Sequence, residues 1–270
     1  MSSFKEPGFF AFAGEHPTLN GPGAQKWVDR WVVTDIEAYQ KLFENYQGET
    51  AIGDASPYYI YYQKSPYNIK KYVPEMKLIA ILREPVQRAF SNYVWAVRDR
   101  AEHLSFAEAL AAEESRIKDN WGLKWHYKNQ GFYYQQLKPY YKLFPSSQIK
   151  IYLHDDLVNN PIKTMQDIFG FLDIDDRFEP NMKKKHNTSK LPKNKSWHNF
   201  LDKPNIIKSL VKPLLPLEFR YNLKQNAKRK NLYKPQLEPQ IKQELATEYR
   251  EDILKLQDLI QQDLSKWLTN

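Results

Sequence analysis

Residues 77–93 read Lys-Leu-Ile-Ala-Ile-Leu-Arg-Glu-Pro-Val-Gln-Arg-Ala-Phe-Ser-Asn-Tyr. The part over 78–82 is continuously apolar, which is typical of a parallel strand covered on both faces. Pro85 follows shortly after, and proline is well tolerated in the first turn of a helix. The stretch therefore predicts a buried strand over 77–82 and a helix over 86–98, with Arg83 at their junction.

Similar patterns along the chain predict an α/β fold. Residues 149–153 read as a second interior strand and residues 50–54 as a short third one. Apolar spacing of three and four predicts helices over 35–43, 104–116, 132–144 and 161–172. Strands that alternate with helices indicate a parallel central sheet flanked by helices.

The C-terminal part differs from the rest. Residues 183–235 are basic and interrupted by prolines, so we expect a loop followed by short helices. Residues 240–268 predict one long amphipathic helix, because apolar residues recur on one face of it. That apolar stripe needs the main body to cover it, which favours a single domain over residues 1–270.

The charge is unevenly distributed. The net charge is +8, but residues 183–234 hold 15 Lys and Arg against two acids, a local +13, which leaves −5 for the remainder. A basic segment on a near-neutral body indicates a polyanionic partner, such as a nucleotide or a sulfated or phosphorylated substrate. Lysines that only solvate the surface are the alternative.

Several classes of site and location are disfavoured by composition. The chain has no cysteine, which excludes disulfides, zinc–thiolate sites and thiol catalysis. Its six histidines show no metal-binding spacing, so no metal site is expected. There is no signal-peptide pattern and no run of ~20 apolar residues. These features predict a soluble, cytoplasmic protein without a membrane span.

The strand–helix junction is a candidate anion site. Ligands of open α/β sheets bind beyond the carboxyl ends of the strands, which is where Arg83 lies. Its planar guanidinium matches a phosphate in a bidentate manner, and Ser91, two turns into the helix, would reach the same anion. Alternatively, Arg83 pairs with a core carboxylate and Ser91 is only helix surface.

The junction resembles the 3′-phosphate-binding segment of the PAPS-dependent sulfotransferases, in their heparan-sulfate-sulfotransferase-like branch. That segment is a strand followed by Arg-x-Pro-x-x-Arg-x-x-Ser-x-Tyr, matched here by Arg83, Pro85, Arg88, Ser91 and Tyr93. The resemblance implies a P-loop NTPase-like sulfotransferase fold. It also implies that Arg83 and Ser91 bind the 3′-phosphate of the sulfate donor PAPS, 3′-phosphoadenosine 5′-phosphosulfate.

Shorter matches extend the resemblance. Residues 5–10 look like the family's Glu-x-x-Phe-Phe segment, which implies that Glu6 is the general base. Residues 53–59 look like its Gly-Glu-x-Ser-Pro-x-Tyr turn, and residues 131–137 like its Gly-x-Tyr-x-x-x-Leu helix start. Residues 186–190 resemble the late loop that covers the cofactor, which implies that Lys190 touches PAPS.

Some residues remain open to two interpretations. His16 is near Glu6 in the sequence and is an alternative base. Trp121, Trp125 and Tyr127 either line an acceptor groove or belong to an aromatic core.

Two departures from the family pattern affect the expected activity. The phosphosulfate loop, Gly-x-x-Lys-x-Gly-Thr-[Ser/Thr], is missing, and residues 21–26 are no substitute because Pro22 removes a backbone donor. We therefore expect an N-terminally truncated fold. We also expect impaired catalysis, since losing such preorganised donors typically costs ~10²–10³ in rate for each one. Ala55 stands where heparan sulfate enzymes usually carry lysine, which disfavours a heparan acceptor.

The predicted function is transfer of a sulfuryl group from PAPS to a hydroxyl or amine acceptor, either a glycan or a small molecule. Nucleic acid is not expected as a partner. The alternative is a catalytically impaired remnant that binds a nucleotide or polyanion. A P-loop kinase or NTPase is set aside, because the chain has no Gly-x-x-x-x-Gly-Lys-[Ser/Thr] string.

Overall fold

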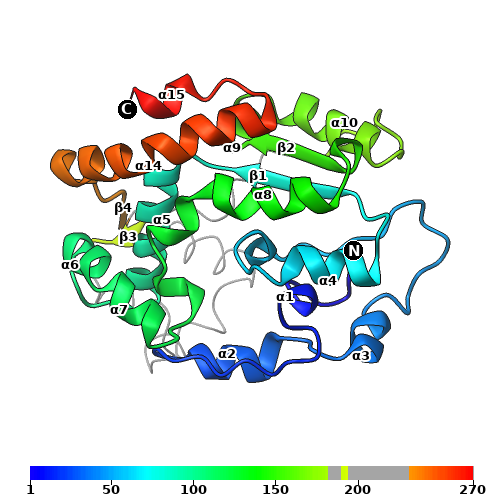
Figure 1. The fold of residues 1–270 in the computed structure, drawn as a ribbon, viewed down its shortest axis with the longest axis horizontal. Helices are drawn as coiled ribbons and strands as arrows, with labels where there is room; N and C mark the ends of the chain where they lie inside the picture. Colours follow the sequence, from blue (N-terminus) through cyan, green and yellow to red (C-terminus); the bar gives the residue numbers. More distant parts are fainter. Residues whose placement is uncertain (182–189, 194–230, 270) are drawn as a thin grey trace, which may run out of the picture.

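The computed structural model describes residues 1–181, 190–193 and 231–269 (Figure 1). A parallel pair of strands lies inside it: β1 (Leu78–Leu82) and β2 (Ile149–Leu153), in register from Leu78 opposite Ile149 to Leu82 opposite Leu153. Both strands lie where the apolar runs predict them, and the parallel α/β arrangement is confirmed. The strand predicted over 50–54 is wrong, because these residues join no strand among the described elements.

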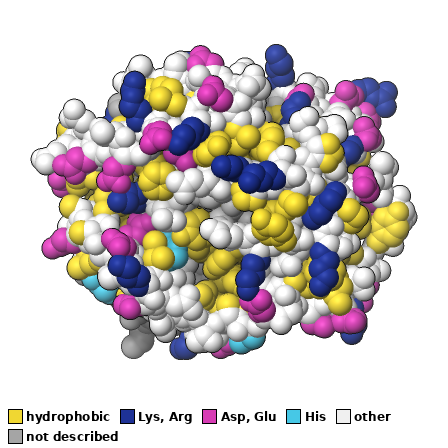
Figure 2. All heavy atoms as spheres, viewed as in Figure 1, with side chains coloured by type: hydrophobic (Ala, Val, Ile, Leu, Met, Phe, Trp, Pro, Cys, Tyr) yellow, Lys and Arg dark blue, Asp and Glu magenta, His cyan; other side chains and the backbone are white. Residues whose placement is uncertain are grey.

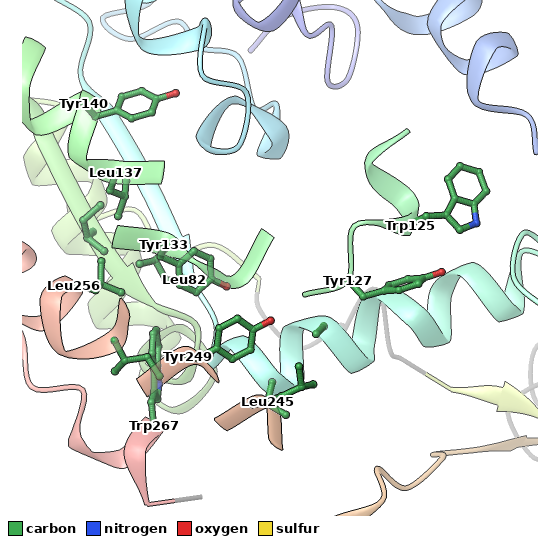
Figure 3. Packing of buried hydrophobic residues seen from close by; sticks show 14 of the residues in the cluster. Leu82, Trp125, Tyr127, Tyr133, Leu137, Tyr140, Leu245, Tyr249, Leu256 and Trp267 are labelled. Atoms are coloured by element: carbon green, nitrogen blue, oxygen red, sulfur yellow. The ribbon is translucent and has the colours of Figure 1, made fainter. Parts of the chain in front are cut away.

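The two faces of the strand pair are covered differently. Leu82 and Ile151 belong to the main core, together with Leu137 of α8 (Tyr133–Leu143) and Leu256 of α14 (Pro239–Ile260); Figure 3 shows part of this packing. On the opposite face, the Tyr152 hydroxyl donates to Asp167 of α10 (Pro161–Phe171) at 2.6 Å. Each strand therefore has at least one face packed against helices.

The second face of β1 departs from the prediction that both faces are covered. Ile79 and Ile81 alternate along the strand with buried neighbours, yet they are 37% and 45% exposed. Their register partners Lys150 and Tyr152 are held by α10, which does not extend over the isoleucines. The face covered on β2 is therefore open on β1 among the described residues.

Helix α5 (Pro85–Arg98) follows β1 directly and agrees with the predicted helix. It begins where Glu84 caps it: the carboxylate accepts from the Val86 and Gln87 amides at 2.8 and 2.7 Å. Pro85 occupies the first turn, where its missing N–H costs nothing. This tight connection fixes Arg83 between the strand end and the helix start.

The C-terminal helix is shorter than predicted. The apolar stripe over 240–268 is buried, but α14 ends at Ile260 because Gln261 adopts a left-handed conformation with φ 53°. The chain turns there, and the Leu264 amide donates to the Gln257 side chain at 2.9 Å before α15 (Ser265–Leu268) begins. α14 packs beside α8 and α5, as the stripe requires.

The helix predicted over 104–116 is instead two short helices, because the backbone turns at Ala112. The remaining described elements are short. They are α1 (Phe9–Phe12), α2 (Ala24–Trp31), α3 (Ile36–Lys41), η1 (Pro57–Ile60), α4 (Ser65–Tyr72), α6 (Phe106–Ala111), α7 (Glu113–Lys118), η2 (Leu123–Trp125), η3 (Asn129–Gly131), η4 (Ser146–Gln148) and α9 (His154–Asn159).

Most of the basic segment over 183–235, with its expected loop and short helices, lies outside the described residues. What is described there is β3 (Leu191–Pro192), paired antiparallel with β4 (Leu232–Tyr233). β3 lies beside α5 (Figure 1). Among the described helices, none is both long and apolar enough to cross a membrane.

Candidate functional site

Arg83 is the first residue beyond β1, and its side chain is half-buried. Its Nη2 donates to Gln87 Oε1 over a long 3.4 Å, and its Nε is buried without a hydrogen-bond partner in the described part of the chain. Its carbonyl accepts from the Tyr133 hydroxyl at 2.9 Å, which anchors the backbone. Arg83 is therefore held in place while its guanidinium keeps unused donor capacity.

Among the described residues, no carboxylate pairs directly with the Arg83 guanidinium. In the ranges that the structure describes, Arg83 forms no ion pair, so the alternative of a core carboxylate partner is not supported. The adjacent Glu84 is committed to capping α5; burial raises its pKa, while the two amide hydrogen bonds and nearby positive charge oppose the rise. Since Glu84 already occupies the first-turn amides, the Arg83 side chain is the group at this junction with donors left to offer an anion.

Ser91 lies on the same face of α5 as the residue that Arg83 contacts. Gln87 and Ser91 are four residues apart on the helix, so Arg83, Gln87 and Ser91 follow one line from the strand end. Ser91 is half-buried. Lys190 is exposed and directly precedes β3, which lies beside α5. Three of the four predicted site residues thus lie on α5, at its entry or just before the neighbouring strand β3.

Arg88, the second arginine of the junction, has a different role. Its guanidinium donates to the Tyr127 carbonyl, and it lies close enough to Glu113 and Tyr249 to shift their pKa values. Tyr249 in turn donates to the Lys128 carbonyl at 2.8 Å. Arg88 therefore ties α5 to the segment after α7 and to α14, a role that the sequence spacing did not reveal.

Glu6 belongs to a segment that is fastened to the protein body. The Ser2 and Ser3 amides donate to the Gly53 and Leu42 carbonyls, both at 2.9 Å, and the Pro7 carbonyl accepts from Val33 at 2.8 Å. The Glu6 side chain is 36% exposed, and Lys5 Nζ lies 3.3 Å from its carboxylate. A frayed, unstructured Glu6 is therefore not what the structure shows.

The backbone around Glu6 is strained. Glu6 has a φ of 58°, in the left-handed region that non-glycine residues rarely adopt. Its carbonyl accepts from the Tyr58 hydroxyl at 2.5 Å, and the Gly8 amide donates to Ser56 Oγ at 3.2 Å. Strain of about 1–3 kcal/mol persists only where the surroundings impose it, and such positions are common at functional sites.

Comparison with known proteins identifies the family. A family model described as "Sulfotransferase family" matches residues 13–180, more than half of the chain. The chain belongs to the sulfotransferase family. The match includes β1, β2, α5 and Arg83, which are the elements that build the junction.

Relatives of this sulfotransferase agree with that assignment. The mouse (Mus musculus) heparan sulfate glucosamine 3-O-sulfotransferase 3B1 is 26% identical over 163 residues, which cover 59% of this chain and 41% of the relative. The membrane-associated sulfotransferase kil1 of Dictyostelium discoideum is 30% identical over 99 residues, covering 34% and 21%. The chain thus spans less than half of the length of these curated relatives.

A solved structure resembles the whole fold. The crystal structure of a sulfotransferase from Alicyclobacillus acidocaldarius has a TM-score of 0.75 and 28% sequence identity, covering 98% of this chain and 87% of that chain. The α/β sulfotransferase fold predicted from the junction is therefore confirmed.

Asp54 organises the turn that holds Glu6 in this sulfotransferase. Its carboxylate accepts from Ser56 Oγ at 2.9 Å, from the Tyr39 hydroxyl at 3.4 Å and from the Tyr59 hydroxyl. Burial raises the pKa of Asp54, the three donors oppose the rise, and the nearby charge of Glu6 adds to it. The sequence indicated the turn over 53–59 but not that one carboxylate gathers three hydroxyls.

The predicted catalytic residue and the predicted nucleotide-binding arginine are not in direct contact with one another in the described part of the chain. Within the described residues no hydrogen bond or ion pair connects Glu6 to Arg83, which lie on separate segments. His16, the alternative base, is exposed and 3.2 Å from Asp29 on α2. Trp125 and Tyr127 are fully buried, so the core interpretation holds for both of them. No cluster of potential metal ligands occurs in the described ranges.

Proposed function

We propose that this sulfotransferase moves a sulfuryl group from PAPS to a hydroxyl or amine acceptor. The observation that carries the proposal is Arg83. It is a half-buried cation at the carboxyl end of a parallel strand, with one buried donor unpartnered and no acidic partner in the described part of the chain. A buried donor and charge left in this state are costly unless a ligand satisfies them.

The residues present fit the nucleotide end of PAPS. Arg83 and Ser91 would hold the 3′-phosphate, because guanidinium and hydroxyl groups on one side of α5 offer charge and hydrogen bonds together. Lys190, next to α5 through β3, would add positive charge over the same anion. PAPS supplies the sulfuryl group when it is bound.

Glu6 is the proposed general base. Its carboxylate would take the proton of the acceptor hydroxyl or amine while the bond from the acceptor to sulfur forms and the bond from sulfur to the phosphate leaving group breaks. The fixed backbone supports this role, because a base must stay within hydrogen-bond reach of the acceptor. Tyr58 and Asp54 hold the segment that presents Glu6.

The test is sulfate transfer itself. Labelled PAPS is offered with a panel of alcohols, amines and glycans to the wild-type chain, to Glu6→Gln and to a control, Glu15→Gln, whose exposed carboxylate pairs with Lys64. We expect Glu6→Gln to lower the rate by ~10²-fold or more with little change in nucleotide affinity, and Glu15→Gln to keep full activity.

Two results would contradict the proposal. An active wild type whose Glu6→Gln variant keeps full rate would remove Glu6 from the mechanism and direct attention to His16. Adenosine 3′,5′-bisphosphate binding without transfer to any acceptor would indicate a nucleotide-binding protein that does not transfer sulfate.

A further inference from the structure

A pocket of about 240 Å³ lies between two segments that are far apart in the sequence. One wall is the chain from η1 into α4, and the other is the stretch from η3 into α8. Figure 1 shows α4 and α8 next to one another, and Figure 2 shows hydrophobic side chains across the middle of this face. None of the residues that line this pocket belongs to the proposed nucleotide site.

The two walls are connected to the candidate site. Tyr58, in the same element as the first wall, holds the Glu6 carbonyl. Tyr133, the first residue of α8 in the second wall, does not line the pocket but donates to the Arg83 carbonyl at 2.9 Å. The pocket therefore lies between the element that fixes the proposed base and the element that fixes the proposed nucleotide ligand.

None of the ten residues that line the pocket carries a charge. Three cations directly adjoin lining residues in the sequence. Lys64 contacts Glu15 at 2.6 Å and Lys128 contacts Glu248 at 2.7 Å, while Lys138 is exposed and lies over the Tyr134 ring, which is not part of the lining. A carboxylate or sulfate placed in this pocket would lose water and find no countercharge there. The pocket consequently favours an uncharged ligand.

The lining combines flat apolar surfaces with amides. Tyr61, Tyr62 and Phe132 supply aromatic rings. Each side-chain amide offers two donors and one acceptor, and Gln63 and Gln135 are exposed enough to meet a ligand. A further wall amide, Gln136, has a buried Oε1 without a partner among the described residues.

A neutral sugar ring matches this lining. Its C–H faces are apolar, and its hydroxyls both donate and accept around the rim, as the amides do. The volume is below the ~300–1,000 Å³ typical of pockets for drug-sized ligands, so it suits a single ring. A fully apolar ligand would leave the amides unsatisfied.

We propose that this pocket binds one uncharged sugar residue of the acceptor, beside the position that receives sulfate. This assignment rests on the proposed sulfotransferase function, because it treats the pocket as part of the acceptor site. It predicts an acceptor whose residue at this position carries neither carboxylate nor sulfate.

The test measures sugar binding directly by ligand-observed NMR, without catalysis. The probes are methyl glucopyranoside and methyl N-acetylglucosaminide, compared with methyl glucuronide and methyl N-acetylglucosaminide 6-sulfate. We expect the neutral glycosides to bind at least 10-fold more tightly than the anionic sugars. The double variant Gln63→Ala/Gln135→Ala should weaken neutral binding about 10-fold, whereas Gln240→Ala, an exposed amide on α14, should not.

The outcomes separate this proposal from the function on which it rests. Equal or tighter binding of the anionic sugars, no neutral binding at 100 mM ligand, or an unaffected double variant would each overturn the pocket assignment. Adenosine 3′,5′-bisphosphate is titrated into the same samples, and retained affinity shows that the variants are folded. If the wild type itself does not bind adenosine 3′,5′-bisphosphate, that result counts against the nucleotide site and not against the pocket.

Discussion

At the scale of single residues, Glu6 combines a left-handed backbone conformation with contacts to the buried side chain of Tyr58 and the turn that Asp54 organises. The sequence predicted Glu6 and Arg83 from short motifs, because strand ends and helix starts leave local signals. It did not predict that Tyr58 would hold the Glu6 carbonyl or that Asp54 would gather three hydroxyls. The Tyr58–Glu6 contact joins residues 52 apart in the sequence, so no local spacing encodes it; the Asp54 contacts are closer in sequence, but their geometry depends on how the turn folds.

Gly8 provides a test of how firmly the Glu6 segment is held. Its φ is 71°, and a Cβ there would lie 2.8 Å from Tyr58 Oη. Gly14 has a similar φ of 75°, but a Cβ would meet nothing within 4 Å. We expect Gly14→Ala to cost about 1 kcal/mol of unfolding free energy from backbone strain alone, and Gly8→Ala at least about 1 kcal/mol more.

Chemical denaturation of both variants measures this difference. Equal losses for Gly8→Ala and Gly14→Ala would mean that Tyr58 is free to move away, and that the Glu6 segment is less constrained than the structure indicates.

At the scale of elements, apolar runs predicted most of the regular structure. β1, β2, α5, α8 and α10 lie close to the predicted ranges, because their hydrophobic patterns agree with the packing they meet. The errors occur where the backbone changes direction within a continuous pattern. Ala112 separates α6 from α7, and Gln261 ends α14 although the apolar stripe continues to Trp267.

The sequence did not predict which residues of β1 are buried and which are exposed. Leu82 is 2% exposed, whereas Ile81, its neighbour in the same apolar run, is 45% exposed. Composition alone does not distinguish them, because both are aliphatic residues of one strand. The difference arises from which helices pack on each face.

The two neighbours should therefore respond differently to truncation. Leu82→Ala removes buried methyl groups and leaves a cavity, so we expect a loss of about 2–5 kcal/mol in unfolding free energy. Ile81→Ala should cost less, about 1 kcal/mol, since 45% of its surface remains exposed to water in the folded protein. Urea denaturation of both variants measures this, and similar losses would show that Ile81 is covered in solution.

At the scale of the whole molecule, α14 packs against both α5, which follows Arg83, and α8, whose Tyr133 holds the Arg83 carbonyl. Its buried stripe packs beside α8 and α5, and Tyr249 contacts the segment that Arg88 also holds. The family and the α/β fold could be predicted from one strand–helix junction, because that junction combines a fold signal with a motif that resembles the family's 3′-phosphate-binding segment. The relation between the Glu6 and Arg83 segments could not, since it depends on packing between distant elements.

The central claim is that Arg83 binds the 3′-phosphate of the nucleotide. Calorimetry with adenosine 3′,5′-bisphosphate, using wild type, Arg83→Ala, Arg83→Lys and the control Arg98→Ala at the far end of α5, tests it most directly. We predict that Arg83→Ala weakens binding by about 2 kcal/mol or more, roughly 30-fold, because a charge-assisted contact is lost. Arg83→Lys should restore only part of it, and Arg98→Ala should bind like the wild type. Adenosine 5′-phosphate, which lacks the 3′-phosphate, should bind weakly and be insensitive to Arg83. Equal affinity of wild type and Arg83→Ala for the bisphosphate would contradict the account.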